Sequence, residues 1–134
     1  MALELEIATP ERQLVREEVS EVELPGKDGY MGILPGHAPL LGELGIGHLT
    51  YLSGSRRRTL AVHGGFIEVL DDHVRVLAEA AEKAEDIDAE RAHAALRRAR
   101  EQVISPPPGT EPAEAIAAFD RAQTRIDVAE HRVA

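Results

Sequence analysis

Cysteine and tryptophan are absent from this chain of 134 residues, and its aromatic side chains are two tyrosines and two phenylalanines. Without cysteine, the fold can contain no disulfide framework and can hold no metal through thiolates. Because aromatic residues are few, a core built from the 43% hydrophobic residues must consist mainly of valine, leucine and isoleucine. The length corresponds to one average domain, or to a small domain with an extension.

Long apolar runs and an excess of basic residues are missing as well. No apolar run approaches the roughly 20 residues of a membrane-spanning helix, and the N-terminus has no basic segment followed by an apolar one. Lysine and arginine total 15 against 24 aspartates and glutamates, which gives a net charge of −9. An acidic surface repels phosphate backbones, so nucleic acid is not expected as a partner. We expect a cytosolic protein that does not insert into a membrane.

Signatures of catalysis, phosphate loops and metal binding are also lacking. Gly26-Lys27 is followed by Asp28 instead of the serine or threonine of a phosphate-binding loop. His63-Gly64-Gly65-Phe66 is like an esterase oxyanion strand, but the chain has no Gly-x-Ser-x-Gly nucleophile motif, so we predict a glycine β-bulge there. The six histidines show no metal-ligand spacing. We therefore expect no catalytic residue, no required cofactor and no metal.

The first part of the chain has a β-type pattern. From residue 1 to about 80, apolar residues recur at every second position, as in Leu3, Leu5 and Ile7, which alternate with glutamates. Turn-forming segments interrupt this pattern at residues 25–29, 34–36, 53–55 and 71–72. Short strands divided in this way predict an antiparallel sandwich or barrel, and we choose a β-sandwich over residues 1–84.

The second part has a helical pattern. Asp88 is suited to cap the start of a helix, because its carboxylate can accept backbone N–H bonds. The apolar stripe of this first helix consists of Ala92, Ala95, Leu96, Ala99 and Val103. Residues 105–109 end that helix with three prolines and a glycine, and a second helix can begin near Pro112. Its stripe consists of Ala115, Phe119, Ala122, Ile126, Ala129 and Val133. The chain is thus predicted to be α+β, with an antiparallel two-helix hairpin over residues 85–134.

Alanine dominates the predicted contact between the helices. A buried methyl group contributes little apolar area at about 25 cal/mol/Å², so closing the hairpin gains little free energy. Alanine also favours the helical state of each segment separately. Two helices of this kind can separate without unfolding, although many alanine-rich hairpins are rigid.

Four arginines lie beside this contact line. Arg91 and Arg98 are two helical turns apart and share a face, as do Arg121 and Arg125, which are one turn apart. In an antiparallel hairpin these guanidinium groups can converge, and guanidinium suits bidentate binding of phosphate oxygens. The alternative is that they form ion pairs with the carboxylates of Glu82, Glu90, Asp127 and Glu130.

Three blocks of the sequence closely resemble the epsilon subunit of F-type ATP synthases. They are GILPGHAPLL at residues 32–41, AVHGGFIEV at 61–69 and AEAAEKAEDID at 78–88. Their order and spacing fit, and the resemblance extends over the whole chain. It implies an N-terminal β-sandwich that binds the gamma subunit and rests on the c-ring, at the foot of the central stalk. It also implies a non-catalytic, peripheral protein at the cytoplasmic face of the bacterial cell membrane.

The resemblance gives the hairpin a regulatory role. In this family it can fold against the sandwich or extend along gamma into the alpha/beta catalytic head, where it blocks ATP hydrolysis. Some bacterial members bind one ATP between the folded helices through an Ile/Leu-Asp-x-x-Arg-Ala motif. The positions that match that site here are Glu82, Ile87, Asp88, Arg91, Ala92, Arg98, Arg121 and Arg125. ATP is thus expected as a regulatory ligand.

The resemblance also suggests where partners bind. Tyr30 and Met31 stand where some relatives place a charged residue near the c-ring, and His37 lies in the first matching block. These three residues are the candidate partner interface. Two alternatives remain open: a stalk subunit that senses no ATP, and a free-standing β-sandwich ligand-binding module with a helical oligomerisation tail.

Overall fold

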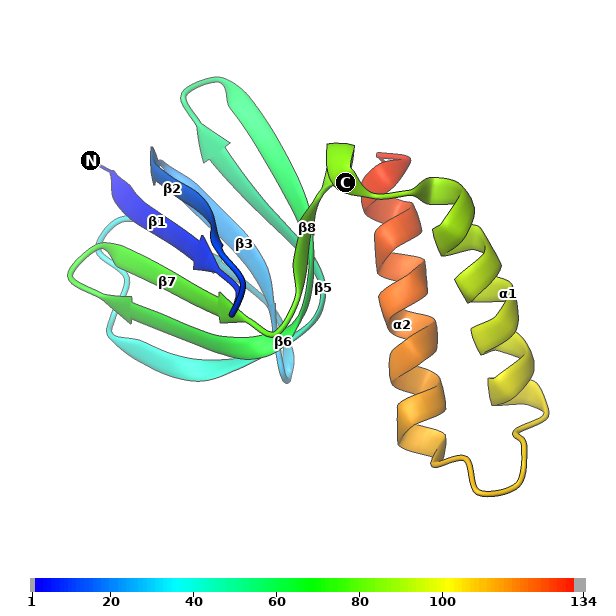
Figure 1. Ribbon diagram of the computed structural model, residues 1–134. Coiled ribbons are helices and arrows are strands. Elements are labelled where there is room, and N and C mark those ends of the chain that lie inside the picture. Colours follow the sequence, from blue (N-terminus) through cyan, green and yellow to red (C-terminus); the bar gives the residue numbers. More distant parts are fainter. Residues whose placement is uncertain (1, 132–134) are drawn as a thin grey trace.

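The computed structural model describes residues 2–131 and confirms the predicted order of a β-sandwich followed by a helical hairpin (Figure 1). The strands are β1 (Leu3–Ala8), β2 (Gln13–Val19), β3 (Glu21–Gly26), β4 (Gly29–Ile33), β5 (Leu40–Ser53), β6 (Arg56–Leu70), β7 (His73–Ala78) and β8 (Ala81–Lys83). The helical elements are the 3-10 helix η1 (Ala84–Asp86), α1 (Ala89–Ile104) and α2 (Pro112–Ala129). No helix within the described range is long and apolar enough to span a membrane.

All strands belong to one hydrogen-bonded network that folds over on itself. The order is β2-β1-β7-β6-β5-β3-β4, and β8 pairs with β6 beside the end of β7. The sequence predicted only short strands, which is wrong for β5 and β6, because these two pair continuously from Leu40↔Val69 to Ser53↔Arg56. Leucine, isoleucine and valine side chains from almost every strand fill the space between the two layers. The core thus has the predicted composition.

A shared bend lets the long strands serve both layers. Ile67 is buried in one half of β6 and Val62 in the other half. Residues five apart in a regular strand point to opposite faces, so the face of β6 that points to the core changes between these two residues. Gly64 and Gly65 lie between them with φ angles of 73° and 130°, and a Cβ atom at Gly65 would collide with the carbonyl oxygen of Leu77. The pairing with β5 keeps one register throughout, so the predicted β-bulge is wrong: the turn is a glycine bend.

One strand pair departs from the predicted antiparallel arrangement. β1 pairs with β7 in parallel, with Leu5 opposite Val74 and Ile7 opposite Val76. The tight hairpin with β6 sets the direction of β7. β1 and β7 are neighbours in the sheet but are separated in the chain by β2 to β6, and this long connection allows them to be parallel. This pair connects the first strand of the chain to the strand that leads toward the helices.

Both helices of the hairpin begin where they were predicted to begin. The Asp88 carboxylate accepts the backbone N–H of Arg91 at 3.1 Å and caps α1, while Pro112 is the first residue of α2. Figure 1 shows that α2 lies between the sandwich and α1, and α2 contacts β5 and β6. α2 is therefore the helix that docks the hairpin.

The helix contact follows most of the predicted stripes. Its buried members are Ala92, Ala99, Ala115, Ala122 and Ile126. Val103 was predicted in the stripe but is 43% exposed, because it lies in the last turn of α1, where the hairpin ends. Val128 was not predicted; it is buried on the side of α2 opposite the stripe, and α2 is the helix that contacts β5 and β6. Val133 lies outside the described residues.

A two-aspartate turn fixes the connection between β4 and β5. Asp71 and Asp72 both have left-handed backbone conformations, with φ angles of 50° and 62°. The Asp72 carboxylate accepts the backbone N–H of Gly36 at 2.7 Å, and its carbonyl oxygen accepts the N–H of Glu4 at 2.9 Å. One residue thus connects the β6–β7 turn to the loop before β5 and to β1.

We expect Asp72→Gly to release that loop without straining the turn, because glycine adopts a positive φ freely and only the side-chain hydrogen bond is lost. The amide proton of Gly36 should exchange with solvent about tenfold faster, measured by hydrogen exchange with NMR detection. Asp72→Asn retains an oxygen acceptor and serves as the control with near-normal protection. Equal protection in both variants would show that the hydrogen bond does not hold the loop.

Candidate ligand site between the hairpin and the sandwich

A pocket of about 390 Å³ lies where the linker, α1, α2 and β8 meet. Its lining residues are Glu82, Asp86, Ile87, Asp88, Arg91, Ala92, Ala95, Arg98 and Arg125. Seven of the eight residues predicted to bind ATP are thus together in one place. The eighth, Arg121, is not part of the lining.

The start of α1 forms one wall of this pocket. Capping by Asp88 fixes the first turn, so Arg91 and Arg98 project from the same face two turns apart. The small side chains of Ala92 and Ala95 lie between them and leave room for a ligand. Neither arginine side chain forms an ion pair or hydrogen bond within residues 2–131, so both are available to an anion.

Glu82 connects the opposite wall to the sandwich. Its Oε1 atom accepts a hydrogen bond from Arg125 Nε at 2.5 Å, and it lies 3.3 Å from Nε2 of His63. His63 is 4% exposed, and within the described chain its Nδ1 atom has no hydrogen-bond partner. A chain of three side chains therefore runs from β6 through β8 to α2. Sequence analysis missed His63, because its contact depends on the pairing of β8 with β6.

The contacts keep Glu82 ionised. The hydrogen bond from His63 is the largest cause that lowers the pKa of Glu82, and the bond and charge of Arg125 act in the same direction. Burial opposes them by penalising the charged form, but the pKa still falls from 4.5 to about 2. Near neutral pH the carboxylate therefore remains a strong acceptor for both neighbours.

Arg121 lies on α2 one turn before Arg125 but makes a different contact. Its Nη2 atom donates a hydrogen bond to Glu114 Oε1 at 2.9 Å, away from the pocket. The predicted convergence of four guanidinium groups is thus found for three. The ion-pair alternative is also met in part, since Arg125 pairs with Glu82, whereas Arg121 pairs with a carboxylate that sequence analysis did not consider.

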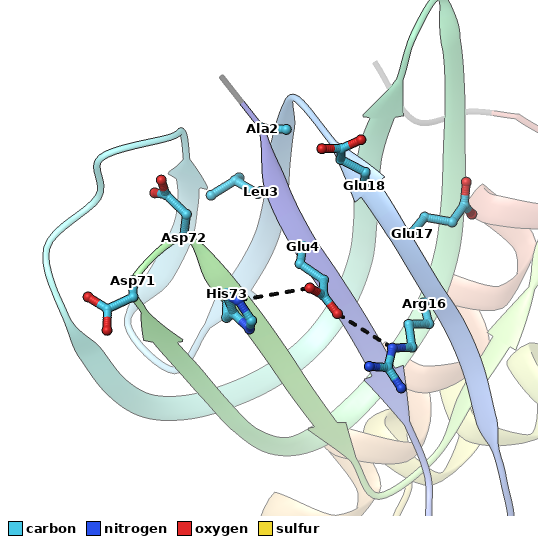
Figure 2. Close-up of a pocket in the computed structure, with 9 residues that line it drawn as sticks. All are labelled: Ala2, Leu3, Glu4, Arg16, Glu17, Glu18, Asp71, Asp72 and His73. Atoms are coloured by element: carbon cyan, nitrogen blue, oxygen red, sulfur yellow. Dashed lines mark ion pairs between the residues drawn. The ribbon is translucent and has the colours of Figure 1, made fainter.

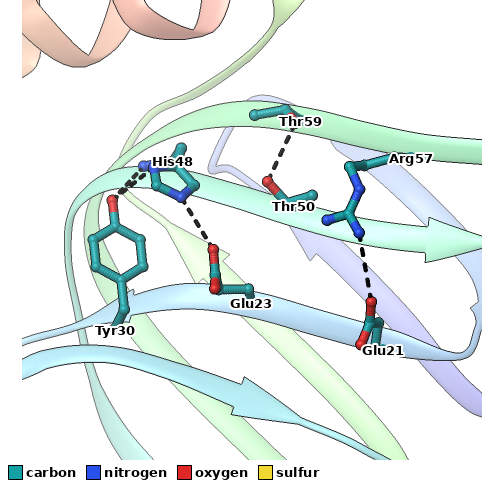
Figure 3. Close-up of polar contacts among 7 residues, drawn as sticks. All are labelled: Glu21, Glu23, Tyr30, His48, Thr50, Arg57 and Thr59. Atoms are coloured by element: carbon teal, nitrogen blue, oxygen red, sulfur yellow. Dashed lines mark hydrogen bonds and ion pairs between the residues drawn. The ribbon is translucent and has the colours of Figure 1, made fainter. Parts of the chain in front are cut away.

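The candidate partner residues occupy different environments. Tyr30 is 50% exposed, and its ring stacks on His48 with the centroids 4.5 Å apart (Figure 3). The Tyr30 hydroxyl lies 3.0 Å from Nδ1 of His48 and accepts the backbone N–H of the same residue, while Nε2 of His48 lies 3.2 Å from Glu23. Partial burial is the main reason why the pKa of Tyr30 is raised.

The other two candidate partner residues lie elsewhere. Met31 is half-buried against the core, and Nδ1 of His37 lies 2.7 Å from the carbonyl oxygen of Ala38.

An exposed apolar surface was missed by sequence analysis. Leu41, Phe66 and Leu77 are 76%, 58% and 48% exposed and lie on β5, β6 and β7, the three neighbouring strands of one sheet. Phe66 is directly opposite Leu77, and Leu41 is two positions along β5 from the residue opposite Phe66. We call these three residues the outer apolar strip. Their alternation with buried neighbours such as Ile67 is the signal that marks them as outward-facing.

A larger pocket of about 520 Å³ lies at the other end of the sandwich (Figure 2). Its charged lining is mainly acidic, and Glu4 pairs there with Arg16 at 3.4 Å and with His73 at 3.8 Å. It contains none of the predicted ligand residues. Because of its acidic lining, it is unsuited to a phosphate ligand.

Two family models together account for almost the whole chain. The β-sandwich domain of the ATP synthase delta/epsilon chain matches residues 2–84, and the long α-helix domain of the same chain matches residues 85–130. The chain belongs to the ATP synthase delta/epsilon family. The resemblance found in the sequence is therefore confirmed.

Individual relatives agree with this assignment. The chain is 59% identical over 130 residues to an ATP synthase epsilon chain of Solibacter usitatus, with 97% of both chains covered. It is 44% identical over 128 residues to that of Syntrophobacter fumaroxidans, with 96% of both covered. The fold resembles a chain in the Euglena gracilis mitochondrial ATP synthase, with a TM-score of 0.82, 26% identity, and 97% of this chain and 82% of that chain covered. As a member of this family, the chain is a non-catalytic subunit of ATP synthase, as predicted.

The depressed pKa of Glu82 predicts a pH-dependent contribution to stability. Because its folded-state pKa lies below the ordinary value of 4.5, the contribution is present above that pH and is lost as pH falls toward about 2. Glu82→Gln should lower the free energy of unfolding by roughly 1 kcal/mol near pH 7, a small value since solvent screens this partly exposed pair. The difference from the unmodified chain should vanish near pH 2, measured by urea denaturation across the pH range.

Glu79→Gln is the control for this experiment, since Glu79 is exposed and precedes β8 on the same stretch of chain. It should cost little stability at any of these pH values. A Glu82→Gln deficit that is constant with pH would show that the ionised contacts do not stabilise the fold.

Proposed function

We propose that the chain acts in the central stalk of an F-type ATP synthase, where its sandwich links the gamma subunit to the c-ring. It would lie peripherally at the cytoplasmic face of the bacterial cell membrane. Family membership supports this proposal. The Euglena neighbour comes from an assembly that contains a c-ring, and a neighbour from the Tetrahymena thermophila central stalk and c-ring shares the fold with a TM-score of 0.62 at 13% identity.

The outer apolar strip supports a docking role for the sandwich. Contiguous apolar side chains on a solvent-exposed face of a sheet are unfavourable in water, and a partner surface that covers them removes this unfavourable exposure. We assign the strip to the gamma subunit. The more polar surface around Tyr30, Met31 and His37 remains our candidate for other partner contacts, including the c-ring.

For the hairpin, we propose regulation by ATP, and the observation that carries this proposal is the pocket with three arginines. The β-sandwich side supplies Glu82, α1 supplies Arg91 and Arg98, and α2 supplies Arg125. A polyphosphate held by guanidinium groups from both helices would bridge them. The pocket exists only while the hairpin is closed on the sandwich, so such a ligand favours the closed state.

The energetic scale suits a switch. A ligand that binds the closed form alone stabilises it by RT ln(1 + [L]/Kd), which is about 2.7 kcal/mol at a hundredfold excess over Kd. The buried contact between the two helices, which is one part of the closed state, consists largely of alanines and contributes little free energy, so the term from the ligand is large enough to matter. At high ATP the hairpin stays folded. When ATP is depleted, it is released toward the alpha/beta head and inhibits hydrolysis.

Arg91→Ala should weaken ATP binding at least tenfold, because it removes from the pocket a guanidinium group that forms no ion pair with a carboxylate in the described part of the chain. Isothermal titration calorimetry of the full chain measures this change. Arg100→Ala is the matched control, as Arg100 is exposed on α1 outside the pocket, and its affinity should equal that of the unmodified chain. If the unmodified chain shows no heat and no thermal shift at millimolar ATP, the chain is a stalk subunit without ATP sensing.

Phe66→Ser should reduce capture of the gamma subunit at least tenfold, because it removes the central side chain of the outer apolar strip. Titration of labelled gamma into the purified chain gives the affinity. Ile104→Ser is the control, since Ile104 is 76% exposed but lies at the far end of α1. A chain that captures no gamma and forms homo-oligomers would instead be the free-standing binding module.

A further inference from the structure

Arg121 is a cation beside the pocket that does not reach into it. It is one helical turn from Arg125 and is 33% exposed, so a change of its side-chain rotamer can turn it along the helix. Its partner Glu114 lies in the first turn of α2, and the 2.9 Å contact draws the guanidinium toward that end of the helix. The pocket is on the opposite side of Arg121 along the helix, at the level of Arg125.

The charge balance of the pocket gives this displacement a consequence. Its lining carries three arginines and three carboxylates, the latter from Glu82, Asp86 and Asp88. Glu82 is ionised and already engages Arg125. The lining therefore has no net positive charge to offer a ligand with several negative charges. One further guanidinium group would change the balance in favour of such a ligand.

We propose that Glu114 restrains Arg121 in the unliganded hairpin, and that Arg121 transfers from Glu114 to the phosphates when the nucleotide binds. This proposal rests on the ATP-binding role proposed above and specifies how that site is regulated. The transfer costs little, because the Glu114 side chain is 68% exposed and exposed ion pairs contribute little stability. A polyphosphate carries several negative charges where Glu114 carries one, and guanidinium can bind its oxygens in bidentate fashion, so the exchange proceeds toward the ligand. Glu114 thus raises the ATP concentration at which the hairpin closes.

The test is Glu114→Gln in the full chain, titrated with ATP by calorimetry. Removing the competing charge should tighten ATP binding about two- to fivefold, the range that corresponds to an exposed ion pair. Glu111→Gln is the matched control, because Glu111 is an acid three residues earlier that makes no side-chain cap contact and lies outside the pocket. Its affinity should not change. Equal helical content by circular dichroism shows that both variants are folded.

A double-mutant comparison identifies the group through which Glu114 acts. Arg121→Ala should weaken ATP binding, and in that background Glu114→Gln should have no further effect. In the unmodified chain, the Nε–H resonance of Arg121 should also shift when ATP is added. Unchanged affinity of Glu114→Gln, or the same gain with and without Arg121, overturns this proposal while leaving ATP binding itself intact. Failure of the unmodified chain to bind ATP overturns both.

Discussion

The Glu82 carboxylate is the contact on which the relation between the two parts of the chain depends. Among residues 2–131 it forms the one side-chain hydrogen bond between the sandwich and α2, through Arg125, and it also engages the buried His63. Apolar packing of α2 on β5 and β6 brings the surfaces together, but such contacts are not directional. The carboxylate adds direction, because it requires one side of α2 to face β8. The pocket exists as a result of that orientation.

The position of Glu82 follows in turn from the bend of the sheet. At Gly64 and Gly65 the strand β6 changes the side that faces the core, and β8 takes over from β7 as its neighbour. Glu82 is thereby placed opposite Ala61, on the outer surface where the helices dock. A backbone feature of the sandwich thus determines which side chain meets α2.

The hairpin combines weak apolar closure with exchangeable charges. Its helices share an alanine-rich contact, and two of its arginines are held by carboxylates, Arg125 by Glu82 and Arg121 by Glu114. Ion pairs that are partly exposed to solvent rearrange at little cost. A phosphate ligand can therefore compete for these arginines, which agrees with the proposed release of the hairpin.

The sequence by itself determined most of the elements and most of the residues that line the candidate site. The change from period two to period 3.6 at Asp88, the cap, the proline at the start of α2 and the motif at residues 87–92 are local properties, so each was predicted and then found in place. Tertiary structure decided the rest: the parallel pairing of β1 with β7, the exchange of sides in β6, the contact of His63 with Glu82 and the turning of Arg121 toward Glu114. Alternation along a chain shows which residues are buried, but not which distant strand lies beside them. The rotamer of a long charged side chain depends on which partner lies within reach, and the fold alone sets that.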